Sequence, residues 1–160
     1  MIKKFAVVFV GLIAVTALVA GCGSSDDESS TSSLTKAEFV KQGNAICRNG
    51  NTKIESEFEE FAEKHHLKKN EKPSEPVLEE ATETILVPAI SSQVEEIRAL
   101  GTPEGDEGEV DKILSGAEEA VEEAEEDPVA FAEEESPKLT KVNEEARAYG
   151  LTVCGEEEGE

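Results

Sequence analysis

The stretch Leu34-Thr35-Lys36-Ala37-Glu38-Phe39 decides the fold of this chain, because it marks the point where a helix begins. Thr35 and Glu38 occupy the two positions of a capping box, in which each side chain accepts a hydrogen bond from a free backbone N–H at the helix start. Leu34 and Phe39 flank the box at the positions of a hydrophobic staple. The stretch therefore predicts a helix that starts after Thr35 and turns one apolar side towards a core.

The residues that follow keep this apolar side over several turns. Four apolar residues recur at intervals of seven, and a fifth fills an intervening turn: Val40, Cys47, Ile54, Phe61 and Phe58. The stripe runs through Cys47 and so places its thiol towards the core. Asn49-Gly50 is a turn signal that can interrupt the segment. Because the phase of the stripe is kept across it, we expect one long helix to about His66, with a break at Asn49-Gly50 as the alternative.

Three more helical segments are predicted, since apolar residues keep recurring every three or four positions. The second segment begins at Ser74, with Pro76 in its first turn, where the missing N–H costs nothing. It runs to Gly101. Pro88 lies inside the segment and should kink or split it.

The last two segments lie in the C-terminal half. A Gly-rich acidic loop, residues 104–108, leads to the third, whose apolar stripe covers residues 110–124. The fourth has a short helical turn and then a helix that Ser136-Pro137 opens and Gly150 caps. Four amphipathic segments with short connections predict an all-α domain, an up-down four-helix bundle whose second helix is kinked at a proline.

The start of the chain has the parts of an export signal. Lys3 and Lys4 precede an apolar run that covers residues 5–20. Val19-Ala20-Gly21-Cys22 ends the run and resembles the lipobox of bacterial lipoproteins. The resemblance implies cleavage after residue 21 and a lipid on the thiol of Cys22, which would hold the protein on the extracytoplasmic face of the cell membrane. An uncleaved membrane anchor is the alternative.

These features divide the chain into four parts. Residues 1–21 are expected to be the lipoprotein signal peptide. Residues 22–33 are expected to be the lipidated cysteine and a disordered Ser/Asp tether, which has no apolar side chain to bury. Residues 34–155 are expected to form the helical domain, and residues 156–160 an acidic tail.

The chain has three cysteines. If the lipobox resemblance commits Cys22 to a lipid, Cys47 and Cys154 remain as one candidate pair. An exported protein lies outside the reducing cytosol, so we expect a disulfide between them. The alternative is a pair of reactive or metal-binding thiols, although neither cysteine belongs to a CxxC motif.

The charge of the chain limits its partners. It has 37 acidic and 15 basic residues and a formal net charge of −22. Binding to nucleic acid requires Lys and Arg side chains that neutralise phosphates, so nucleic acid is not an expected partner. The expected partners are the membrane, through the lipid anchor, and an envelope protein or a cationic ligand.

Glu63, His65 and His66 are the candidate metal ligands. Glu63 and His66 form a Glu-x-x-His motif, which places both on one face of a helix. Di-iron helical bundles use this motif twice, but these two histidines are the only ones in the sequence. We therefore expect exposed histidines at a helix end, with weak copper or zinc binding as the alternative.

The sequence lacks the local motifs of catalysis. It has no Gly-x-Ser-x-Gly elbow, no His-Glu-x-x-His and no phosphate loop. Its many glutamate pairs stand opposite Ala and Val on helices, which is typical of a solvated face. We expect no enzymatic activity, no catalytic residue and no cofactor. The connection 101–108 and Pro88 can shape a groove between helices, although ordinary helix termination explains both.

Four features of the chain resemble a group of known proteins: Cys22, Ala45-Ile46-Cys47, Leu100-Gly101-Thr102-Pro103 and the closing Tyr149-Gly150-Leu151-Thr152-Val153-Cys154. This layout is similar to that of the small, acidic, cysteine-paired helical lipoproteins of high-GC Gram-positive bacteria. Such proteins mostly lack an assigned activity, so the resemblance brings no site residues with it. It implies a binding or structural role at the cell envelope. The alternative is a lipoprotein that binds a metal or small ligand, with Glu63, His65 and His66 or in a pocket between helices.

Overall fold

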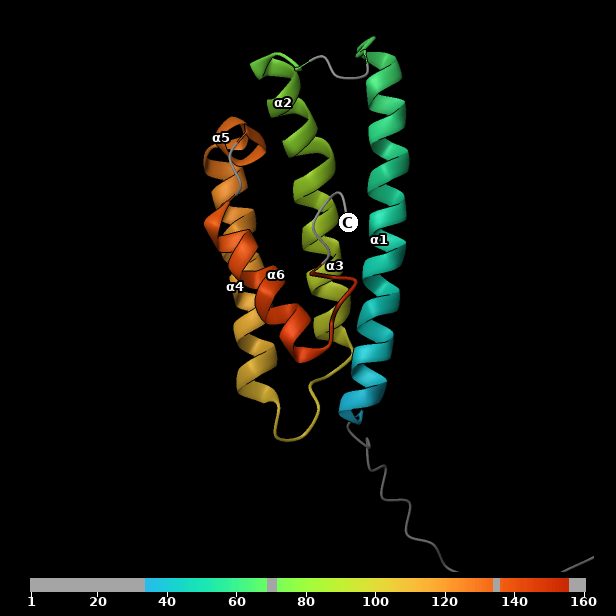
Figure 1. The fold of residues 1–160 in the computed structure, drawn as a ribbon, viewed down its shortest axis with the longest axis vertical. Helices are drawn as coiled ribbons and strands as arrows, with labels where there is room; N and C mark the ends of the chain where they lie inside the picture. The colour runs from blue at the N-terminus through green and yellow to red at the C-terminus, as the bar shows by residue number, and fades with distance from the viewer. Residues whose placement is uncertain (1–33, 69–71, 134–135, 156–160) are drawn as a thin grey trace, which may run out of the picture. The chain divides into compact units, whose positions relative to one another are not determined.

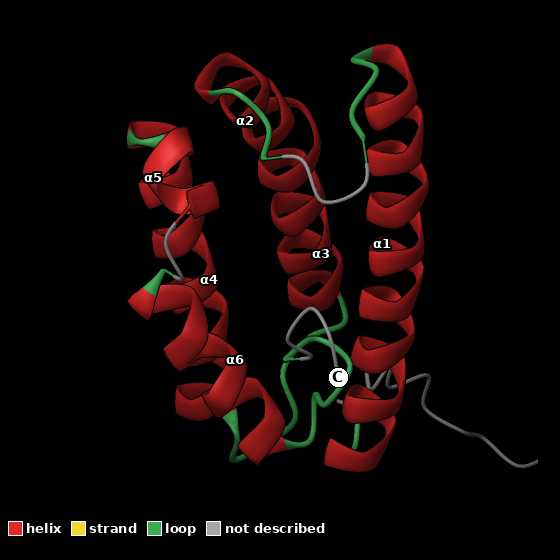
Figure 2. Ribbon diagram, turned by 45° about the horizontal axis from the view of Figure 1, so that its top comes forward, coloured by secondary structure: helices red, strands yellow, loops and turns green. Residues whose placement is uncertain are grey.

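The structure, a computed structural model, describes residues 34–68, 72–133 and 136–155. Every regular element within these residues is a helix, as the colouring of Figure 2 shows. The prediction of an all-α domain is therefore confirmed. The predicted signal peptide, Cys22, the tether and the acidic tail of residues 156–160 lie outside the described residues.

Helix α1, Lys36–Lys64, begins as the sequence predicts. The Thr35 N–H donates to Glu38 Oε2 at 3.0 Å, and the Glu38 N–H donates to Thr35 Oγ1 at 3.3 Å. The capping box is therefore complete. Phe39 is fully buried, and Leu34 packs against the same core, as expected of the staple.

Helix α1 runs without a break through Asn49-Gly50, so the local turn signal does not interrupt it. A Cβ atom on Gly50 would lie 2.5 Å from the side-chain amide of Gln93 on a neighbouring helix. The glycine at this position therefore lets the side chain of Gln93 pack closely on α1, and a larger residue would require that side chain to move. The helix ends at Lys64, two residues before the predicted end.

The second predicted helix contains a π-helical turn. Its three consecutive parts are α2 (Glu75–Ala81), the π-helical turn η1 (Thr82–Leu86) and α3 (Val87–Ala99). Pro88 has no N–H group, and its ring would clash with the carbonyl four residues earlier in a regular α-helix. The turn that precedes Pro88 closes with a hydrogen bond to the fifth residue back instead of the fourth. The interruption expected at Pro88 takes this form.

The C-terminal half forms three helices: α4 (Glu107–Glu126), α5 (Pro128–Glu133) and α6 (Pro137–Tyr149). Ser136 caps α6, because its Oγ accepts a hydrogen bond from the Leu139 N–H. Gly150 ends α6 with φ at 117°, in the left-handed region. The Leu151 N–H donates to the Ala146 carbonyl at 2.8 Å, so the predicted C-cap is confirmed.

The long helices pack in chain order. Helix α1 contacts α3, α3 contacts α4, and α4 contacts α6. Figure 1 shows that α6 lies over α4 and that the chain then returns towards α1. We call this returning segment, residues 150–155, the C-terminal turn. It is joined to α1 by the expected disulfide between Cys47 and Cys154, whose Cα atoms are 5.1 Å apart.

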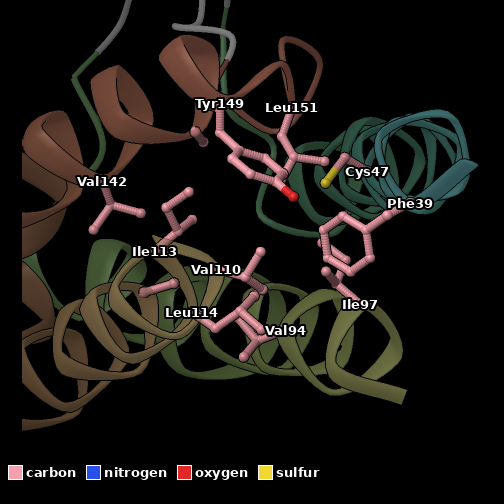
Figure 3. Packing of buried hydrophobic residues seen from close by; sticks show 12 residues of the cluster. Phe39, Cys47, Val94, Ile97, Val110, Ile113, Leu114, Val142, Tyr149 and Leu151 are labelled. Carbon is pink, nitrogen blue, oxygen red and sulfur yellow. The ribbon is translucent and has the colours of Figure 1, made fainter. Parts of the chain in front are cut away.

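The main core lies where these helices and the C-terminal turn meet. Phe39 and Leu151 are 0% and 1% exposed, and Figure 3 shows side chains from α1, α3, α4 and α6 converging around them. A smaller cluster of Phe61, Ala81 and Ile85 lies between α1, α2 and η1. The disulfide sulfur of Cys47 belongs to the main core, as its place in the apolar stripe predicts.

Candidate functional site

An apolar cavity of about 200 Å³ lies between α1, η1, α3, α4, α6 and the C-terminal turn. Small-molecule sites in proteins are usually concave and mostly apolar, with a few polar groups that orient the ligand. The cavity has this character, because Ile, Leu, Val and Ala side chains make up most of its lining. It is the candidate functional site of the described part of the chain.

Helical spacing explains how each wall is built. Residues three or four positions apart share one face of a helix, and each helix contributes such a set. The wall from α3 contains Ile90, Gln93, Val94 and Ile97, and the wall from α6 contains Leu139, Val142, Asn143 and Ala146. The sequence pattern that predicts a buried face therefore also produces the cavity wall.

The residues that line the cavity differ in how far they are buried. Val94, Ile113 and Leu114 line it and are buried. Leu86 and Ile90 also line it but keep part of their surface exposed. These two residues lie on either side of Pro88, which is itself exposed. Pro88 itself does not line the cavity, and neither does any residue of the connection 101–108.

The lining carries no formal charge. None of the described residues that line the cavity is an Asp, Glu, Lys, Arg or His, although 52 of the 160 residues of the chain are Asp, Glu, Lys or Arg. The polar residues of the lining are Asn51, Gln93 and Asn143, each of which carries a side-chain amide. A charged ligand would lose its hydration in this site without meeting an opposite charge.

The three amides differ in their hydrogen bonds. Asn51 Nδ2 donates to the carbonyl of Val153 in the C-terminal turn at 3.4 Å. The side chains of Gln93 and Asn143 form no hydrogen bond with the residues that the structure describes. Both residues are partly buried. Gln93 and Asn143 therefore offer donors and acceptors to a bound molecule.

The C-terminal turn closes one end of the cavity. Leu151 and Cys154 of this turn line it, together with Cys47. Besides the disulfide, Asn44 on α1 holds the turn: its Nδ2 donates to the Gly150 carbonyl at 3.0 Å, and its Oδ1 accepts from the Val153 N–H at 2.9 Å. This end of the cavity is thus fixed to α1 by covalent and hydrogen bonds.

A polar cluster secures the neighbouring end of the domain. The Tyr149 hydroxyl donates to Asp106 Oδ2 at 2.7 Å, and Lys36 Nζ lies 3.8 Å from the centre of the tyrosine ring. Burial, followed by the hydrogen bond to Asp106, raises the pKa of Tyr149 well above its ordinary value. The cluster ties α6 to the starts of α1 and α4 and lies outside the cavity lining.

The candidate metal ligands do not come together. Glu63 and His66 are exposed, while His65 stacks on Phe61 with the ring centres 4.2 Å apart. His65 Nε2 lies 3.4 Å from Glu80 Oε1 on α2, so its acidic neighbour is on another helix. Within residues 34–68, 72–133 and 136–155, no three His, Cys, Asp or Glu side chains form a group that could hold a metal ion.

An exposed ion pair accompanies this histidine. Lys64 Nζ lies 2.7 Å from Glu80 Oε1, and this hydrogen bond is the main cause that lowers the pKa of Glu80. The sequence did not predict either contact of Glu80, because they depend on how α1 and α2 pack. The Glu-x-x-His motif concerned Glu63 and His66 and carried no prediction of an acidic neighbour for His65.

Sequence patterns alone did not identify the amides of the cavity. Each of them stands at a position that belongs to an apolar stripe: Asn51 lies one turn after Cys47, and Gln93 lies one turn after Ile90. An amide on a buried helix face is the signal that could have indicated them.

We find no helix in the described part of the chain with the length and apolar character needed to cross a membrane.

Comparisons with protein families, curated proteins and solved structures give no match to this chain.

Proposed function

We propose that this chain is a lipid-anchored protein of the extracytoplasmic membrane face whose helical domain binds a small, mostly apolar ligand in the cavity. The observation that carries the proposal is an uncharged cavity of about 200 Å³ in a chain with a net charge of −22. The anchor is inferred from the lipobox resemblance of residues 19–22. We include the up-down four-helix arrangement in the proposal, supported by the contacts of α1 with α3, α3 with α4, and α4 with α6.

The chemistry of the lining favours binding over catalysis. General acid–base catalysis needs a titratable side chain, and covalent catalysis needs an activated nucleophile. The described lining contains amides and a disulfide instead of a titratable side chain or an activated nucleophile. Amides orient a ligand by hydrogen bonds, and the apolar walls supply binding energy as they lose contact with water.

Ligand-induced stabilisation tests the proposal. The probe is toluene, and the readout is the melting temperature of the mature lipidated chain in small phosphatidylcholine vesicles, followed by circular dichroism. A ligand that binds only the folded state raises stability by mass action. At a free concentration about tenfold above its Kd, toluene should raise the melting temperature by about 5 °C.

Two alanines on α6 give a matched pair of variants. Ala146 lines the cavity and is 3% exposed, whereas Ala148 is exposed and does not line it. Ala146→Leu puts an isopropyl group into the cavity and should abolish the toluene effect, and Ala148→Leu should keep it. Ala117→Leu fills the cavity from α4 and replaces Ala146→Leu if that variant does not fold. Equal toluene effects in the wild type and in a folded cavity-filled variant would refute binding in the cavity.

Intact mass tests the anchor separately. The membrane-extracted protein should have lost residues 1–21 and should carry acyl chains on the peptide that begins at Cys22. A mass that corresponds to the chain from Met1 without added lipid would contradict the lipid anchor. The toluene test of the cavity does not depend on that outcome.

A further inference from the structure

We infer that the ligand of the cavity is an uncharged aromatic molecule of about the size of indole, with one N–H or O–H group that hydrogen-bonds to Gln93 or Asn143. The inference rests on the proposed function and specifies its ligand class. It draws on the volume of the cavity, the charge of its lining and the two amides.

The volume of the cavity limits the size of the ligand. An engineered apolar cavity of about 150 Å³ in another protein binds benzene. The cavity of this protein, at about 200 Å³, is larger by less than one such ring. A bicyclic molecule such as indole therefore suits it better than a long acyl chain or a polycyclic lipid.

The charges in and around the cavity exclude ions. An anion would enter an uncharged lining in a chain with a net charge of −22, so both desolvation and the surrounding field oppose it. The acidic exterior attracts a cation, but the described lining offers it no carboxylate. A neutral molecule avoids both the loss of ionic hydration and the repulsion by the net charge of the chain.

The polar residues and the sulfur atoms of the walls determine which chemical groups a ligand needs. Gln93 and Asn143 stand on α3 and α6, on different walls, and neither side chain has a hydrogen-bond partner among the residues described. An amide oxygen on either wall can accept from a ligand N–H or O–H group. The disulfide of Cys47 and Cys154 adds polarisable sulfur to the lining, which makes favourable contacts with aromatic rings.

The absence of tryptophan from the sequence makes the test direct. The chain has no Trp and a single Tyr, so the fluorescence of added indole reports its binding. The assay uses the full lipidated chain in small phosphatidylcholine vesicles, which contain no other protein. The cavity-filled variant Ala146→Leu, or Ala117→Leu in its place, serves as the blank for indole that dissolves in the lipid.

Indole is compared with three analogues by competition. Indene has the same shape without the N–H group, tryptamine adds a positive charge, and indole-3-carboxylate adds a negative charge. Indole should bind about fivefold more tightly than indene, as expected for one hydrogen bond. Both ions should bind at least about tenfold more weakly than indole.

Variants of the two amides identify the hydrogen bond. Gln93→Leu or Asn143→Leu should remove the preference for indole over indene while indene still binds. Gln42→Leu, at an exposed amide of α1 outside the lining, serves as the matched control that keeps the preference. Equal binding of indole and indene by the wild type would overturn the inferred hydrogen bond, and so would a preference that survives in both leucine variants. If toluene binds and indole does not, the ligand class is wrong while the proposed function stands. If neither binds, the proposed function itself fails.

Discussion

Breaking the disulfide between Cys47 and Cys154 is the sharpest test of how the domain is held together. The bond spans a sequence separation of 107 residues, so it restricts nearly the whole domain in the unfolded state. In the chain-entropy treatment, closing a loop of this length stabilises the folded state by about 4.8 kcal/mol. For a domain of about 120 residues, this corresponds to a fall in melting temperature of about 15–20 °C when the bond is absent.

The assay is thermal unfolding, followed by circular dichroism, of the wild type and of the double variant Cys47→Ala/Cys154→Ala. The double variant should melt about 15–20 °C lower than the oxidised wild type. A phosphine reductant should lower the melting temperature of the wild type by a similar amount and leave the double variant unchanged, which controls for any other effect of the reductant. A double variant that melts within about 3 °C of the wild type would refute the entropic reasoning, since the hydrogen bonds of Asn44 would then suffice to hold the turn.

Three further predictions concern single residues. Gly43→Ala should destabilise the domain by about 1–3 kcal/mol in a denaturant titration, because the new Cβ would lie 2.5 Å from the buried side chain of Leu151. Gly108→Ala is the control, because it lies in the first turn of α4 and no atom comes within 4 Å of the new Cβ. It should be neutral or stabilising in the same titration. Tyr149→Phe should flatten the alkaline limb of a plot of melting temperature against pH. The folded-state pKa of this tyrosine is raised, so its contribution is complete below about pH 10 and is lost as the pH rises above that value. An identical limb in the variant and the wild type would contradict this. Thr35→Ala should lower the free energy of unfolding by about 1 kcal/mol through loss of the capping box, and no change in denaturant midpoint would show that the box is unimportant.

The beginning of α1 and the burial of Cys47 could be predicted because their determinants are local. A capping box needs only neighbouring residues, and an apolar stripe needs only helical spacing. The pairing of Cys47 with Cys154 followed from the count of cysteines once Cys22 was assigned to a lipid. The structure contains this disulfide.

Other features depend on tertiary contacts that local patterns do not contain. The apolar stripe predicted that α1 continues through Asn49-Gly50, but it did not indicate that Gly50 lies against the side chain of Gln93 on α3. The acidic neighbour of His65 is Glu80, which only the packing of α2 on α1 brings within reach. Pro88 predicted an interruption, but its form as a π-helical turn depends on how the helix continues on both sides. The cavity is likewise a tertiary feature, because its volume is what the side chains leave unfilled between four helices.

A cavity of this size opposes folding. Empty volume in a protein core costs about 24 cal/mol per Å³, so about 200 Å³ corresponds to at most about 5 kcal/mol, and less where the mouth admits water. The disulfide stabilises the domain by a similar amount, which offsets that cost. If the volume were only imperfect packing, filling it would bring a gain in stability and no loss. If it is a binding site, Ala146→Leu should hold or raise the melting temperature of the free protein while it removes the ligand effect. Stability gained at the expense of binding is what a retained functional cavity predicts.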